Sequence, residues 1–214
     1  MNERLKKITV AAMLCALSYV LMCLCRIPVV LFLKYDPKDI VIALGGLIYG
    51  PMMTVAVSLV VSLVEMITVS DTGLIGFVMN VLSTCTFATV ASLIYKKWHS
   101  VKGALAGLLC GVAVTVAAMM LWNALVTPLY MQVPRETVIE LLIPAFLPFN
   151  LLKAGLNASL TFLLYRPVVT ALRKARLIPP SQGGQKKNLL PLTLVVSLLV
   201  VTCVLVILAF NGVI

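Results

Sequence analysis

Apolar residues fall in long runs along this chain, and charged residues gather in the segments between them. Most runs reach the ~20 residues that a helix needs to cross a bilayer, far longer than the ~10-residue alternating segments of a membrane β-barrel. The second run is short and is followed by Gly50-Pro51, which predicts a tight helical hairpin with the third. The pattern therefore predicts seven membrane helices, at residues 8–25, 40–49, 52–69, 73–95, 103–126, 143–165 and 189–210.

The sixth run, residues 143–165, carries polar residues at helical spacing. Asn150, Lys153 and Asn157 are three and four positions apart, so they share one helical face. A lysine at membrane depth is costly and usually points into a protein cavity or toward a partner, which makes Lys153 a candidate functional residue. Pro144 and Pro148 interrupt the outer half of the run and free backbone groups that protein or ligand must satisfy.

The overall composition agrees with a membrane location. Of the 214 residues, 62% are hydrophobic and 11% are charged, and the mean hydropathy is +1.11, so polar residues are too few to cover a water-soluble globule. We expect an all-α integral membrane protein embedded in the lipid bilayer. Its expected parts are a membrane domain at 1–176, a cytoplasmic linker at 177–188 and an additional transmembrane helix at 189–211.

The formal net charge of +10 is informative through its placement rather than its size. If the N-terminus is cytoplasmic and every run crosses, twelve of the seventeen basic residues lie inside and four lie outside, which satisfies the positive-inside rule. Seven crossings place the C-terminus outside the cell. Because the charges follow membrane topology, we expect no nucleic-acid partner.

The sequence contains few features that would indicate an enzyme or a metal-binding protein. The chain has no HExxH, GxSxG or GxxxxGK[ST] motif, and His99 is the single histidine. The six cysteines show no CxxC pair and lie within or at the ends of apolar runs, where small packing residues are expected. We therefore expect a protein that is not an enzyme, has no catalytic residues and holds no metal or cofactor.

Polar residues near the expected outer surface suggest a binding pocket. Asn123 ends the fifth run, and together with Asn150 and Lys153 it offers amide and ammonium groups suited to a flat, neutral or mildly acidic heterocycle. Asp36 is expected to cap a helix whose first residue is Pro37 and whose third is Asp39. Glu65 lies inside an apolar run and either faces the cavity or reaches the interface.

Small residues predict close helix contacts in two places. Ala12 and Ala16 are four apart and give the first helix a smooth face, either for packing inside the bundle or for another protein. Gly103, Gly107 and Gly111 form a similar stripe on the fifth run.

Four segments resemble one family of transport proteins: FLKYDPKDI, GGLIYGP, LWNALVTPLYM and LPFNLLKAGLN. Together with the order of the spans over residues 8–172, they are similar to the riboflavin-specific substrate-binding subunit (S component) of energy-coupling factor (ECF) vitamin transporters. The resemblance implies a six-helix bundle with an extracellular-side riboflavin pocket. It also implies polar ligand contacts from Asn123, Asn150 and Lys153, and docking of Ala12 and Ala16 on a membrane scaffold subunit, with two ATPase subunits completing the complex.

Several alternatives remain open at this level. Tyr35, in the expected lid at residues 26–36, and Tyr130 are further candidate ligand contacts, although both positions also suit interfacial tyrosines. Two other hypotheses for the function are a solitary secondary transporter of a flavin or related heterocycle, and a membrane scaffold in which Lys153 pairs with Glu65 or with an acid of a partner. Lys34 and Arg135 leave room for the phosphate or dinucleotide forms of the flavin.

Overall fold

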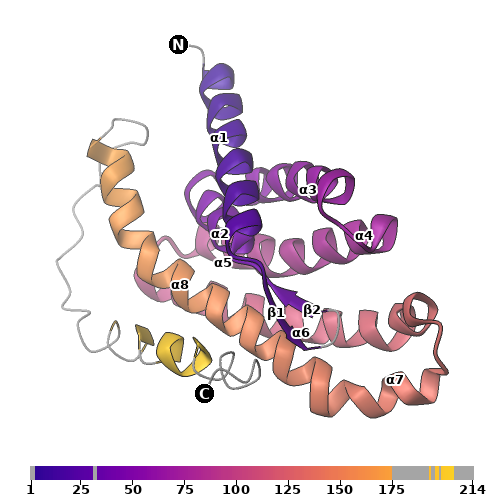
Figure 1. Ribbon diagram of the computed structural model, residues 1–214. Coiled ribbons are helices and arrows are strands. Elements are labelled where there is room, and N and C mark those ends of the chain that lie inside the picture. Colours follow the sequence, from indigo (N-terminus) through magenta and orange to yellow (C-terminus); the bar gives the residue numbers. More distant parts are fainter. Residues whose placement is uncertain (1–2, 31–32, 175–192, 194–195, 198, 205–214) are drawn as a thin grey trace.

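The computed structural model describes residues 3–30, 33–174, 193, 196–197 and 199–204. They form a bundle of helices in which α8 runs diagonally across the molecule and α1 extends beyond it at one end (Figure 1). Within these residues, five helical stretches are long and apolar enough to cross a membrane. The helices are α1 (Glu3–Leu24), α2 (Lys38–Tyr49), α3 (Pro51–Thr68), α4 (Gly73–Thr84), α5 (Val90–Lys97), α6 (Val101–Met131), α7 (Arg135–Leu141) and α8 (Leu147–Lys174).

Helix α2 lies at the centre of the bundle although it is too short to cross it. Its 12 residues span about 18 Å, against about 30 Å for the hydrocarbon core of a bilayer. It is almost entirely buried and packs against α1, α3, α5 and α8. Gly50, at φ 96°, turns the chain into α3, and Pro51 is the first residue of that helix. The predicted hairpin of a short and a long helix is therefore confirmed.

The glycine stripe predicted on the fifth run brings α6 against the preceding span. A Cβ atom on Gly107 would lie 2.6 Å from the carbonyl oxygen of Ala91, and one on Gly111 would lie 2.6 Å from that of Phe87. No side chain fits in that space, so these two glycines allow the backbones to touch. This contact closes the core cluster that includes Phe87, Ala91 and Leu108.

Two membrane helices contain a π-helical turn. Residues Cys85–Thr89 (η1) join α4 to α5, and Leu142–Phe146 (η2) join α7 to α8. Single π turns are frequent at functional sites because they shift side chains relative to the regular helix. The second of them contains Pro144 and precedes Pro148, where the sequence predicts an interrupted helix.

A short β-hairpin follows α1 and was not predicted. Strands β1 (Ile27–Val30) and β2 (Leu33–Tyr35) pair antiparallel in the segment expected to be a plain lid. Leu33 packs with Val138, Phe146 and Phe149, which joins the hairpin to α7, η2 and α8. The hairpin therefore positions the residues that follow it, 36–39, against the inside of the bundle.

The prediction of an all-α membrane bundle is confirmed, with this hairpin as an addition. The predicted linker at 177–188 lies outside the described residues, as does most of the predicted seventh helix. Of that last segment, Val196 packs against the core, and Val200 and Cys203 pack beside Tyr35 and Leu156.

Candidate functional site

The loop between β2 and α2 places a carboxylate beside the membrane lysine. Asp36 is 5% exposed, and its Oδ2 lies 3.3 Å from Nζ of Lys153 on α8. The Asp36 carboxylate and the Lys153 ammonium come from positions 117 residues apart, so only the packing of the hairpin against α8 brings them together. Lys153 therefore does face the protein interior, as its helical position predicts, but its partner is Asp36 rather than Glu65.

The prediction that Asp36 caps the following helix is wrong. Helix α2 begins at Lys38, its N-cap residue is Pro37, and that cap makes no side-chain hydrogen bond. Burial raises the pKa of a carboxyl group, but the ammonium groups of Lys153 and Lys38 outweigh it and hold the pKa of Asp36 below its ordinary value. Asp36 is therefore ionised at neutral pH and balances the lysine charge.

A second buried ion pair adjoins the first. Lys38, 1% exposed, binds Glu65 of α3 through Glu65 Oε2 and lies 3.9 Å from Oδ1 of Asp36. Arg26, after α1, lies 3.7 Å from Oε1 of Glu65. Lys38, which the charge count placed among the outer residues, is therefore buried, and Glu65 faces the interior rather than the interface.

Asp39 lies at the junction of three elements. Its Oδ1 accepts a hydrogen bond from Thr84 at 2.6 Å, and its Oδ2 accepts one from Asn157 at 3.3 Å. The hydroxyl of Tyr35 donates to Oδ1 of Asn157 at 3.1 Å. Asn157, on the same α8 face as Lys153, thus holds the β2 tyrosine and the α2 carboxylate in place.

Asp39 and Asn157 line a small pocket between α2, α4, η1, α6 and α8. Asn150 and Lys153 both line it, as the sequence predicts. Asn150 is 6% exposed and donates from Nδ2 to the backbone oxygen of Phe146, at the end of η2, at 2.8 Å. The other lining residues are Asp39, Ser83, Phe87, Thr115, Ala154 and Asn157.

The pocket surface combines hydrogen-bonding groups with one aromatic ring. Lys153 has three N–H donors, and within the described chain Asp36 accepts from one of them. Hydroxyl, amide, carboxylate and ammonium groups face the same space as the ring of Phe87. This arrangement suits a polar, partly aromatic small molecule and offers no group of three or more metal-ligating side chains in the described residues.

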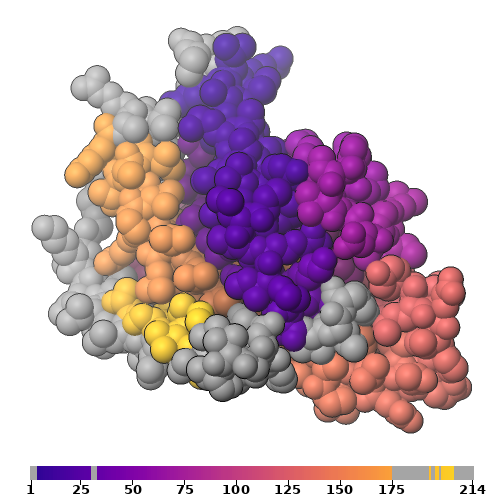
Figure 2. Space-filling view, in the orientation of Figure 1, coloured from indigo at the N-terminus to yellow at the C-terminus, as the bar shows by residue number. Residues whose placement is uncertain are grey.

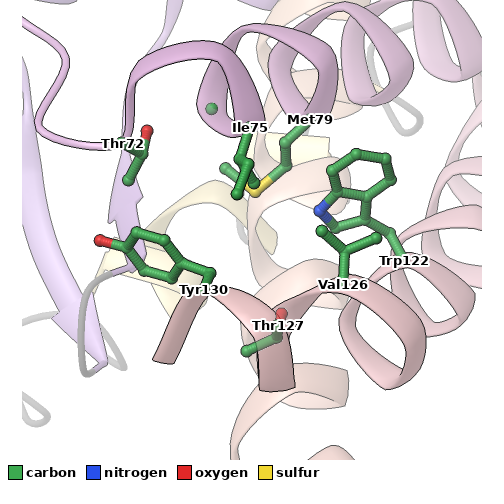
Figure 3. A pocket seen from close by; sticks show the side chains of 8 residues that line it. Thr72, Ile75, Met79, Trp122, Val126, Thr127 and Tyr130 are labelled. Carbon is green, nitrogen blue, oxygen red and sulfur yellow. The ribbon is translucent and has the colours of Figure 1, made fainter. Parts of the chain in front are cut away.

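Asn123 and Tyr130 lie along α6 but outside this lining. Asn123 is 1% exposed and accepts a hydrogen bond from Thr127 at 3.1 Å, while its Nδ2 has no partner in the described residues. Thr127 and Tyr130 line a second pocket between α4 and α6. Figure 3 shows the Trp122 and Tyr130 rings of α6 facing Ile75 and Met79 of α4 across it.

Tyr35 also lies outside both pockets. It is 5% exposed and packs with Leu156, so its ring belongs to the wall behind Asn157. Burial and the neighbouring carboxylates of Asp36 and Asp39 raise the pKa of its hydroxyl, which keeps it a neutral donor. The sequence predicted Tyr35 as a candidate ligand contact and did not reveal its hydrogen bond to Asn157.

Comparisons with known proteins agree with one another. A family described as "ECF transporter, substrate-specific component" matches residues 6–165. The chain is 28% identical to riboflavin transporter FmnP of Bacillus subtilis (strain 168), covering 81% of this chain and 99% of that protein. It is 27% identical to riboflavin transporter RibU of Staphylococcus aureus (strain TCH60), covering 79% and 93%. A solved structure described as the S component of a bacterial ECF transporter matches with a TM-score of 0.69 and 26% sequence identity. The match covers 80% of this chain and 99% of the solved chain.

Proposed function

Because this chain belongs to the family of substrate-specific components of ECF transporters, we propose that it is a multi-pass membrane subunit that captures riboflavin for uptake. Its two aligned relatives are named riboflavin transporters and match almost their whole length. ATP hydrolysis is then the task of partner subunits, a membrane scaffold and two ATPases, rather than of this chain. We further propose that the N-terminus is cytoplasmic and that the pocket opens on the outer side.

The observation that carries the proposal is the pocket beside Asn150 and Lys153. A flavin ring system presents carbonyl oxygens and an imide N–H on one edge, and an ammonium and an amide supply the matching donors and acceptor. The ribityl chain presents hydroxyl groups, which Ser83 and Thr115 can bind. The pocket leaves far less open space than a flavin needs, so binding requires the surrounding side chains to move.

The direct test is a riboflavin titration of the purified chain in detergent. We expect quenching of flavin fluorescence that saturates at one riboflavin per protein, and a yellow protein when it is purified without removing bound ligand. Binding by the isolated chain separates a binding subunit from a scaffold. A colourless protein that leaves riboflavin fluorescence unchanged contradicts the proposed function.

The second part of the proposal is that α1 is the surface for the scaffold subunit. Ala12 and Ala16 are exposed. Figure 2 shows that the side of α1 in view is largely uncovered by other elements. Two small residues four apart let another helix approach closely. Because Ala12 and Ala16 are exposed, the structure does not favour the alternative in which they pack inside this bundle.

We therefore expect that the double substitution Ala12→Leu and Ala16→Leu leaves riboflavin binding unchanged. It is expected to reduce ATP-dependent uptake at least about tenfold in vesicles that contain the whole complex, because the bulkier side chains hold the scaffold helix away. Ala113 and Ala117 on α6, also exposed and four apart, provide the matched control. Equal uptake by both double variants would remove α1 from the docking surface.

A further inference from the structure

We propose that residues 199–204 form a strap that holds the β-hairpin against α8 and thereby slows both the entry and the release of the ligand. This inference rests on the proposed function, because the rates in question are those of riboflavin exchange at the pocket beside Lys153. The strap lies beyond the part of the chain that the family matches, which ends at residue 165. It therefore brings to the site an element from outside the matched region.

The strap is helical and has two different faces. Val200 and Cys203 are three positions apart, so they lie on one side of the helix, and both are half-buried. Val201 and Val204, each one position further along, are 53% and 42% exposed. Figure 1 shows this segment, in yellow, beside α8. The strap thus has an inward face, Val200 and Cys203, and an outward face, Val201 and Val204.

The inward face contacts the hairpin and α8 together. It packs against the cluster formed by Tyr35 of β2 and Leu156 of α8, which are 5% and 3% exposed. Val29 of β1 packs against the same cluster. Both strands and α8 therefore meet beneath the strap, and the hairpin cannot move away from α8 without losing this apolar contact.

The same part of the hairpin is attached to the pocket. The hydroxyl of Tyr35 donates to Oδ1 of Asn157 at 3.1 Å, and the next residue, Asp36, lies 3.3 Å from the Lys153 ammonium. Asn157 and Lys153 both line the pocket. The hairpin is therefore held by the pocket wall on one side and by the strap on the other, through Tyr35 and the residue that follows it.

The hairpin is also the element around the pocket that is expected to move. Strands β1 and β2 have four and three residues, and a two-stranded sheet of this size is marginally stable by itself, so its position depends on what packs against it. The pocket has less open space than a flavin needs, so ligand entry displaces part of its surroundings. Opening of the hairpin provides this space, and it separates Tyr35 from the strap, which raises the barrier to exchange.

The strap is expected to change the rates of binding more than the affinity. None of residues 199–204 lines the pocket, so the contact of the strap with Tyr35 is the same whether the hairpin closes over a ligand or over an empty pocket. A contact that is equal in both end states cancels from Kd. It contributes only to the open state through which the ligand passes.

The test measures riboflavin exchange by stopped-flow fluorescence on the full-length protein in detergent. Val200→Phe together with Cys203→Phe overfills the inward face and displaces the strap, so we expect association and release each to become at least about fivefold faster. Kd is expected to stay within about twofold of the wild-type value, because both rates rise together. Val201→Phe together with Val204→Phe places the same rings on the outward face and is expected to keep the wild-type rates.

Wild-type protein provides a second test if the inward-face variant does not fold. N-ethylmaleimide alkylates the thiol of Cys203 when the strap separates from the hairpin, and mass spectrometry of the peptide that contains Cys203 follows the reaction. Because the closed hairpin encloses a bound flavin, saturating riboflavin is expected to slow this alkylation at least about threefold. Alkylation of Cys110, which is exposed on α6, is expected to stay unchanged.

The outcomes distinguish the strap from the proposed function. Wild-type rates in a folded inward-face variant, a weaker Kd without faster association, or alkylation of Cys203 that riboflavin does not slow would each overturn the strap while riboflavin binding stands. If the wild-type protein does not bind riboflavin, the proposed function fails and this inference fails with it.

Discussion

Replacing Lys38 with Met is expected to destabilise the protein by about 3–5 kcal/mol, the usual cost of removing one partner from a buried ion pair. Lys38 is 1% exposed and lies between Glu65 and Asp36. Without its ammonium, the buried carboxylate of Glu65 loses its nearest cation and keeps Arg26 at 3.7 Å, while Asp36 loses one of its two lysine partners and keeps Lys153. Thermal unfolding in detergent, followed by circular dichroism, measures the effect as a lower midpoint.

The matched control is Lys34→Met, four residues earlier in the chain. Lys34 also pairs with an acid, Asp71, but that pair is largely exposed, so its loss is expected to cost no more than about 1 kcal/mol. Adding Glu65→Leu to Lys38→Met removes the carboxylate that Lys38 binds and should recover much of the lost stability. Similar unfolding midpoints for Lys34→Met and Lys38→Met would show that Lys38 is not held in a buried network.

Replacing Lys153 with Ala is expected to weaken riboflavin binding by about 2 kcal/mol or more, which is about thirtyfold in Kd. The substitution removes a charged donor from the pocket and leaves Asp36 without its nearest partner. Asn150→Ala is expected to have a smaller effect, about 1 kcal/mol, because one neutral amide is lost. Fluorescence titration with riboflavin measures both.

Two substitutions outside the pocket serve as controls for this series. Lys102→Ala removes an exposed cation at the start of α6, and Asn80→Ala removes a half-buried amide of α4 that lines neither pocket. Both are expected to keep the wild-type Kd. If Lys153→Ala and Asn150→Ala also keep it, the pocket assignment is wrong, although the transport role remains.

Helical periodicity and apolar run length predicted a large part of this molecule from local information. The spans, the half-length second helix and the close contact at Gly107 and Gly111 follow from patterns within a few turns of chain. The resemblance in four short segments led to the family that residues 6–165 match. The shared face of Asn150, Lys153 and Asn157 also follows from spacing alone, and all three line one pocket.

The buried ion pairs could not be predicted from local sequence patterns. An Asp followed by Pro before an apolar run is the ordinary signature of a helix cap, and nothing local distinguishes Asp36 from one. A lysine in a polar segment, such as Lys38, is normally solvated. Both are buried here because the unpredicted hairpin turns residues 36–39 inward, against α8 and α3.

For this protein, the sequence alone therefore determined the membrane class, the family and the lysine-bearing face of α8, because periodicity and motif are properties of neighbouring residues. The tertiary structure decided which charges meet. Asp36 and Lys153 are 117 positions apart, and Lys38 and Glu65 are 27 apart, so their pairing depends on how the hairpin and helices pack. Because both pairs are buried, loss of one partner leaves an unmatched charge away from water and destabilises the fold.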